Sequence, residues 1–152
     1  MPAANVLYLS HAPEAMYDAI RAHVPDGVAL ATLARDDDAE RVAKLADAEI
    51  VVVAAYRFRA DLIAAAKRLR FVQHQGVGYQ DTIDLAALRA TGARLALTPE
   101  GTTDSVAEHT IMLMLAACRH LPFADSELRQ GRFHINRLRP ISRDIGGMTI
   151  GY

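Results

Sequence analysis

Short aliphatic runs alternate with alanine-rich amphipathic segments over residues 1–98. The aliphatic runs have the length and β-branched content of strands, and the amphipathic segments repeat their apolar residues at helical spacing. The predicted strands span residues 5–9, 28–33, 50–54, 71–74 and 94–97, and the predicted helices between them span residues 14–23, 39–46, 61–69 and 85–90. The strand over residues 50–54 is apolar throughout, as expected when both faces of a parallel strand are covered.

This alternation predicts right-handed crossover connections and a parallel sheet flanked by helices. We therefore predict a flavodoxin-like α/β domain over residues 1–98. Pro99 and Gly101 then interrupt the pattern, which indicates a boundary near residue 99.

The pattern from residue 99 to residue 152 is predominantly helical. Ser105-Val106-Ala107-Glu108 fits a capping box, so a helix is predicted to begin at Ser105 and to run to about Arg119. Residues 111–115 make this helix apolar nearly all round, and such a helix needs partners on several sides. A polar helix over residues 123–130, an irregular arm over residues 133–145 and the start of a strand over residues 148–152 are predicted to follow.

Composition and charge exclude several classes of protein. The 152 residues include 17 Lys and Arg against 18 Asp and Glu, for a net charge of −1, so no basic field draws the chain to nucleic acid or to an anionic membrane. Cys118, the single cysteine, excludes a disulfide framework, and the histidines show no metal-ligand spacing. The longest apolar stretch is far shorter than the roughly 18 residues of a membrane span. The N-terminal residues lack signal-peptide features. These features predict a soluble, cytoplasmic protein without a metal site.

Gly76-Val77-Gly78 follows the predicted strand at residues 71–74, at the edge of the sheet where open α/β folds bind ligands. Two glycines allow successive N–H groups to point at an anion, and we expect Gly78→Val to strain the turn. A plain glycine turn is the alternative. The segment is not a dinucleotide fingerprint, because Asp81 stands where the third glycine would be.

Further segments along the chain strengthen the hypothesis that the glycine loop binds a ligand. Residues 76–84 read G-V-G-Y-Q-D-T-I-D, residues 92–95 read G-A-R-L, and residues 99–109 read P-E-G-T-T-D-S-V-A-E-H. Together they resemble the D-isomer-specific 2-hydroxyacid dehydrogenases, whose usual patterns are G-V-G-Y-D-N-I-D and P-G-x-x-x-x-x-V-A-E. Residues 128–133 and 145–151 are also similar to the arm and the first cofactor-domain strand of that family. The resemblance is weak before about residue 69 and strong from residue 71 onward.

The resemblance implies roles for individual residues. The amides of Gly76, Val77 and Gly78 would hold the substrate carboxylate, Thr102 would line the substrate pocket, and Thr103 would contact the nicotinamide half of NAD or NADP. Residues 99–152 would form a linker, an interdomain and dimerisation helix with its arm, and the first strand of a truncated Rossmann NAD-binding domain. Glu100 departs from the family pattern by placing an acid near an anion site.

The same resemblance implies that the chain is the N-terminal portion of an oxidoreductase. That enzyme would transfer hydride between NAD(P)H and a 2-oxo acid or D-2-hydroxy acid, and would form a homodimer. The family's glycine turn and its catalytic Arg, Glu and His would lie beyond Tyr152, so this chain would contain no catalytic residue and would be inactive alone.

Other polar residues near the predicted carboxyl edge have simpler interpretations. His74, next to the glycine loop, is interpreted as a structural histidine. Tyr56, Arg57 and Arg59 could select a substrate, but a solvated helix start is the favoured interpretation.

Two non-enzymatic functions remain as alternatives. A flavodoxin-like small-molecule-binding or signalling domain would have the same topology, although Ser10-His11-Ala12-Pro13 is not the Ser/Thr/Gly-rich loop of a flavin site. A dimerisation fragment is compatible with the apolar helix.

Overall fold

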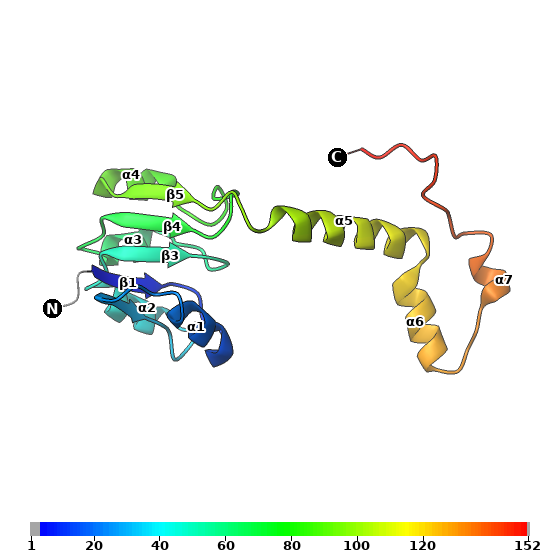
Figure 1. Ribbon diagram of the computed structural model, residues 1–152, viewed down its shortest axis with the longest axis horizontal. Helices are drawn as coiled ribbons and strands as arrows, with labels where there is room; N and C mark the ends of the chain where they lie inside the picture. The colour runs from blue at the N-terminus through cyan, green and yellow to red at the C-terminus, as the bar shows by residue number, and fades with distance from the viewer. Residues whose placement is uncertain (1–3, 152) are drawn as a thin grey trace. The chain divides into compact units, whose positions relative to one another are not determined.

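The computed structural model describes residues 4–151 and divides the chain into two compact units, one ending at Glu100 and one beginning at Gly101 (Figure 1). The first unit contains a five-stranded parallel sheet in the order β2-β1-β3-β4-β5. Its strands are β1 (Ala4–Tyr8), β2 (Val28–Ala31), β3 (Ile50–Val53), β4 (Phe71–His74) and β5 (Arg94–Leu97). Its helices are α1 (Glu14–Arg21), α2 (Asp38–Leu45), α3 (Ala60–Ala65) and α4 (Leu85–Thr91). This strand order confirms the predicted flavodoxin-like α/β fold.

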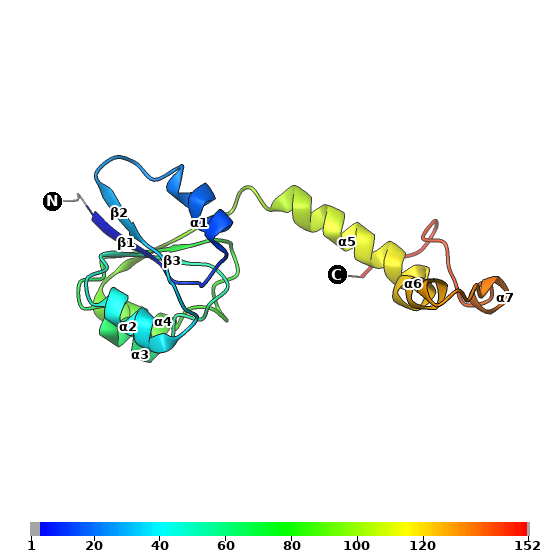
Figure 2. The same cartoon turned by 90° about the horizontal axis from the view of Figure 1, so that it is seen from below.

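Helices cover the two faces of the sheet unequally. Figure 2 shows α2, α3 and α4 together on one face and α1 on the other. The main core lies under the three helices, where alternate strand residues such as Leu7, Val51 and Val72 are fully buried. On the face of α1, the rings of Tyr8 and Tyr17 pack edge to face with their centroids 6.1 Å apart. Val52 packs against this second cluster and is partly buried, so both faces of β3 are covered as expected, the face under α1 less completely.

The observed elements agree with the predicted ones except in their ends. The strands at 71–74 and 94–97 match to the residue. The helix predicted over residues 61–69 ends at Ala65, because Ala66 leaves the helical conformation at φ −81° and ψ 70°. Ala66 and Leu69 are nevertheless buried in the main core, which is why the apolar spacing continued beyond the helix.

The second unit consists of helices joined by short turns. Its helices are α5 (Thr103–Cys118), α6 (Leu121–Arg129) and α7 (Ile135–Leu138), and none of residues 101–151 is buried. The predicted capping box is wrong, because α5 begins before Ser105. The carbonyl of Thr102 already accepts from the N–H of Val106 at 2.9 Å, so Ser105 lies inside the first turn.

The C-terminal arm also differs from its prediction. It contains the short helix α7 within residues that were expected to be irregular. Residues 148–151 form no strand, and Tyr152 lies outside the described residues. A strand needs a neighbour to complete its hydrogen bonds, and residues 101–151 provide none. Over the described part of the chain, no helix is long and apolar enough to cross a membrane.

Candidate functional site

A glycine loop follows β4 at the carboxyl edge of the sheet. Gly76 has φ +145°, a conformation that side chains disfavour, and a Cβ placed there would lie 3.3 Å from Cε1 of His74. Gly78 has no such constraint, since a Cβ there would meet nothing within 4 Å. The expectation that Gly78 is the strained position is therefore wrong, and the turn requires its glycine at Gly76.

The base of this loop is fixed by hydrogen bonds from the neighbouring strands. The Gln75 N–H donates to the carbonyl of Val53 at 2.8 Å, which extends the ladder past the end of β4. Thr98, directly after β5, donates its N–H to the carbonyl of Gly76 at 3.1 Å and its hydroxyl to the carbonyl of His74 at 3.0 Å. The loop therefore starts from a rigid edge rather than from a free connection.

The tip of the loop is open. Val77 is 55% exposed and Gly78 is also exposed. Among residues 4–151, no hydrogen-bond acceptor meets the N–H groups of Gly76, Val77 or Gly78. Consecutive free N–H groups on a fixed turn are the arrangement that backbone anion sites use.

His74, the last residue of β4, stands behind this loop. It is 4% exposed, and its Nε2 lies 2.9 Å from the hydroxyl oxygen of Thr82. This burial and contact agree with the structural role predicted for it. Thr82 had no sequence signal that marked it as a partner, because the contact depends on how residues 79–82 fold back over β4.

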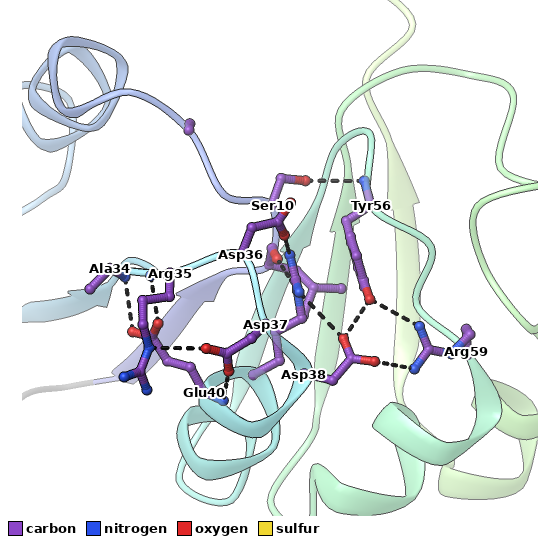
Figure 3. Close-up of polar contacts among 12 residues, drawn as sticks. Ser10, Ala34, Arg35, Asp36, Asp37, Asp38, Glu40, Tyr56 and Arg59 are labelled. Atoms are coloured by element: carbon purple, nitrogen blue, oxygen red, sulfur yellow. Dashed lines mark hydrogen bonds and ion pairs between the residues drawn. The ribbon is translucent and has the colours of Figure 1, made fainter.

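Side chains of the protein itself occupy the carboxyl ends of β1 and β3. This is the point where the strand order reverses, and where flavodoxin-like folds bind ligands. The hydroxyl of Ser10 accepts from the N–H of Tyr56 at 3.2 Å (Figure 3). The guanidinium of Arg41, which is 1% exposed, lies 3.5 Å from the centroid of the Tyr56 ring and donates to the carbonyl of Leu9.

Carboxylates complete this cluster. The Tyr56 hydroxyl donates to Asp38 and accepts from Arg59 at 3.0 Å, and Arg59 pairs with Asp38 at 2.6 Å (Figure 3). Arg59 also pairs with Asp61 at 2.9 Å. The Tyr56 hydroxyl and then the Arg59 guanidinium lower the pKa of Asp38. Arg59 is the N-cap residue of α3 and 37% of its side chain is exposed, which agrees with a helix start. Tyr56 is half-buried and packs against Arg41, so for Tyr56 the interpretation as a solvated residue is wrong. Arg57, by contrast, is exposed as expected.

Sequence reasoning missed Arg41, around which this cluster is built. Its ion pair with Asp38 at 3.3 Å has the i,i+3 spacing of neighbours on a helix. This ion pair could therefore have been predicted from the sequence. Its burial against Tyr56 depends on tertiary packing and had no sequence signal.

The two threonines that the family resemblance assigns to the site, Thr102 and Thr103, belong to the second unit. Thr102 is the N-cap residue of α5 without a side-chain capping bond, Thr103 is the first residue of the helix, and both are exposed. The chain contains no G-x-G-x-x-G turn, and residues 148–151 form no strand to carry one. The residues present therefore do not by themselves make a dinucleotide site. The described residues contain no cluster of His, Cys, Asp or Glu that could hold a metal ion.

Comparisons with known proteins point to one family. Residues 6–149 match the family model described as the D-isomer specific 2-hydroxyacid dehydrogenase, catalytic domain. The D-3-phosphoglycerate dehydrogenase of Archaeoglobus fulgidus is 38% identical over 102 residues, which are 67% of this chain and 19% of that protein. The hydroxypyruvate reductase of Thermotoga maritima is 33% identical over 102 residues, which are 67% of this chain and 32% of that protein.

A solved structure agrees with these sequence matches. The crystal structure of an NADPH-dependent glyoxylate/hydroxypyruvate reductase from Sinorhizobium meliloti has a TM-score of 0.65 and 25% identity, and the similarity covers 99% of this chain and 44% of that one. The chain thus spans less than half the length of the proteins it matches. A match of this extent to the family model, supported by relatives above 30% identity, shows that the chain belongs to the D-isomer-specific 2-hydroxyacid dehydrogenase family.

Proposed function

We propose that the loop Gly76–Gly78 binds the carboxylate of a 2-oxo or 2-hydroxy acid, in the N-terminal portion of an enzyme that transfers hydride between NAD(P)H and that acid. The observation that carries the proposal is the set of three consecutive N–H groups without an acceptor at the carboxyl edge of β4. A carboxylate has two oxygens that accept such bonds, and hydrogen bonds to a charged acceptor are about twice as strong as neutral ones. The similar proteins named above act, by their names, on 3-phosphoglycerate and hydroxypyruvate, which fits this substrate class.

The alternative of a flavodoxin-like binding module is less well supported. Such a module would bind its ligand at the carboxyl ends of β1 and β3, and the cluster around Arg41 and Tyr56 fills that position. The glycine loop, by contrast, has three consecutive N–H groups that meet no acceptor among residues 4–151.

In the same proposal, Thr102 lines the substrate pocket and Thr103 contacts the nicotinamide half of NAD or NADP. These assignments rest on family membership and on the position of both residues at the start of α5. The cofactor supplies the hydride, and this chain supplies the group that holds the carboxylate of the substrate. The single cysteine supports a reducing, cytoplasmic setting.

Titration with oxalate, followed by amide chemical shifts, tests the carboxylate site. The largest shifts are expected at residues 76–78. Gly76→Ala should abolish them, because its Cβ is forced to a positive φ and against His74. Gly92→Ala is the matched control, since it strains another positive φ of +75° at the end of α4, where no ligand is expected. Shifts that cluster elsewhere, or that survive Gly76→Ala, contradict the proposal.

We also propose that the 152-residue chain alone does not oxidise NADH or NADPH with glyoxylate, hydroxypyruvate or pyruvate. The chain has no glycine turn for a pyrophosphate, and loss of general acid–base catalysis alone costs roughly 10²–10⁴-fold in rate. A longer chain that includes a complete cofactor domain should be active. Loss of the reduced-nicotinamide absorbance that depends on the short chain would refute this prediction.

Homodimerisation through α5 is part of the proposal. Ile111, Met112 and Leu115 on this helix are 50%, 49% and 43% exposed, and apolar side chains in such number favour a protein partner. Sedimentation should show a dimer that Met112→Asp disrupts, whereas Leu128→Asp on α6 should leave it intact. A wild-type chain that sediments as a monomer at every concentration would exclude the dimer.

A further inference from the structure

His74 carries a buried nitrogen that no group in residues 4–151 satisfies. Its Nε2 contacts the hydroxyl of Thr82, but its Nδ1 has no hydrogen-bond partner among the described residues. An unpaired buried polar atom costs free energy, and native proteins contain few of them. The position of this one, directly behind the glycine loop, requires a physical explanation.

The hydrogen bonds around Thr82 select the tautomer of the ring. The Thr82 hydroxyl also lies 3.3 Å from the carbonyl of Tyr79, to which it can donate its single hydrogen. If the ring carries its hydrogen on Nε2, both bonds form: Nε2–H donates to Thr82, and Thr82 donates to Tyr79. If the hydrogen is on Nδ1 instead, Thr82 must donate to Nε2, and the bond to Tyr79 is lost. Both arrangements leave Nδ1 without a partner, so the additional hydrogen bond favours the Nε2–H form.

The edge of the ring that carries Nδ1 lies against Gly76. A Cβ on Gly76 would be 3.3 Å from Cε1 and 3.6 Å from Nδ1, so the ring occupies the space next to the missing side chain. The carbonyl of the same glycine is held by the N–H of Thr98. Gly76 is therefore fixed from two sides, by the imidazole ring and by the residue that follows β5.

We propose that His74 is a positioning residue: Thr82 orients its ring by accepting a hydrogen bond from Nε2–H, and the ring holds Gly76 in the conformation that presents the amides of residues 76–78. The inference rests on the function proposed above for that loop. It adds a residue that acts through the loop without touching the substrate carboxylate. It also accounts for the unpaired Nδ1. The edge of the ring that carries Nδ1 packs against Gly76, and the hydrogen bond to Thr82 is made by Nε2 on the other edge.

Two variants of Thr82 separate this role from general stabilisation. Thr82→Val removes the hydroxyl at nearly constant shape, and Thr82→Ser keeps the hydroxyl. In the 152-residue chain without ligand, Thr82→Val should shift the amide signals of residues 76–78 and speed their hydrogen exchange. Thr82→Ser should restore both. In the wild type, a long-range ¹H–¹⁵N spectrum of the imidazole near neutral pH should show the Nε2–H form, a measurement that needs no variant.

The oxalate titration gives the corresponding binding result. Thr82→Val should weaken oxalate binding about five-fold, as expected when one net hydrogen bond is lost, and Thr82→Ser should restore it. A wild-type ring without hydrogen on Nε2, unchanged loop amides in Thr82→Val, or equal effects of Thr82→Val and Thr82→Ser would overturn the inference. A different outcome would refute the proposed function and leave the positioning role standing. In that outcome the wild-type ring carries its hydrogen on Nε2 and Thr82→Val shifts the loop amides, but the wild-type chain does not bind oxalate.

Discussion

The two units of this chain differ in how their apolar residues are used. In the first unit, aliphatic residues from the strands and from α2, α3 and α4 form a closed core. In the second unit no residue from 101 to 151 is buried, although residues 111–115 of α5 are all apolar. Contacts within this unit include the ion pair between Arg119 and Asp144 and the pair between Arg132 and Glu127.

This difference indicates that the units depend on different sources of stability. The first unit contains the apolar burial that drives folding, so its glycine loop is built on a rigid edge. Short helices with exposed apolar residues are marginal in water, so we expect the second unit to be the less stable of the two. Paired substitutions, one in each unit, test this difference in stability.

The largest contrast is expected from two phenylalanines. Phe58 is fully buried, and its N–H donates to the carbonyl of Thr82, whereas Phe133 is 74% exposed. Phe58→Ala should lower the free energy of unfolding by about 3–5 kcal/mol, and Phe133→Ala should change it by less than about 0.5 kcal/mol. Chemical denaturation monitored by circular dichroism measures both. Similar losses in the two variants would mean that the second unit has a core of its own.

Two arginines provide the next contrast. Arg41→Ala removes a buried guanidinium that packs on Tyr56 and should destabilise the first unit by about 2–4 kcal/mol. Arg129→Ala removes an exposed ion pair with Asp125 and should cost less than about 0.5 kcal/mol. The same denaturation experiment applies. A neutral Arg41→Ala would show that the cluster at β1 and β3 is not structural.

Substitutions at helix N-termini should change the free energy of unfolding by a smaller amount. The Asp37 carboxylate accepts from the N–H of Glu40 at 2.7 Å, so Asp37→Ala should cost about 1 kcal/mol. Ser105 lies inside α5 and caps nothing, so Ser105→Ala should be neutral within about 0.5 kcal/mol, or slightly stabilising because alanine favours helices. A loss of about 1 kcal/mol in Ser105→Ala would restore the capping box that the structure contradicts.

The smallest expected contrast between the two units is in how their stability falls at acid pH. The backbone N–H of Ala34 and the ammonium of Lys44 lower the pKa of Glu40 to about 2, and Arg132 lowers that of Glu127 to about 2. Since the ordinary value is 4.5, each carboxylate stabilises its surroundings fully above that pH and loses this contribution as the pH falls toward 2.

Glu40→Gln should therefore flatten the loss of stability of the first unit between pH 4.5 and about 2. Glu127→Gln should leave the unfolding of that unit unchanged, because Glu127 contacts only residues of the second unit. Parallel acid profiles for wild type and Glu40→Gln would contradict this assignment.

Much of the first unit was predictable from the sequence because local and global signals agree there. The strands at 71–74 and 94–97 are each followed within a few residues by a glycine or a proline, at Gly76 and Pro99, so their ends were visible. The Ser105 motif failed because α5 begins at Thr103, after the N-cap residue Thr102, whose side chain makes no capping bond. A local motif cannot show that the helix has already started. The strand at 148–152 failed because pairing depends on a neighbour that residues 101–151 do not provide.

The candidate site was predictable in place but not in detail. The two glycines after a strand located the loop, but the sequence could not show that Gly76 rather than Gly78 adopts the positive φ. The burial of Arg41 and the contact of His74 with Thr82 join residues that are far apart in the chain or folded back by a turn. Such contacts arise from packing, and no spacing rule identifies them.

Oxalate titration of residues 1–100 alone tests the central claim most directly. If the first unit is a complete fold that carries its own carboxylate site, the shorter chain should fold cooperatively and show the same shifts at residues 76–78. Loss of the shifts in a folded 1–100 chain, or failure of that chain to fold, would contradict the claim.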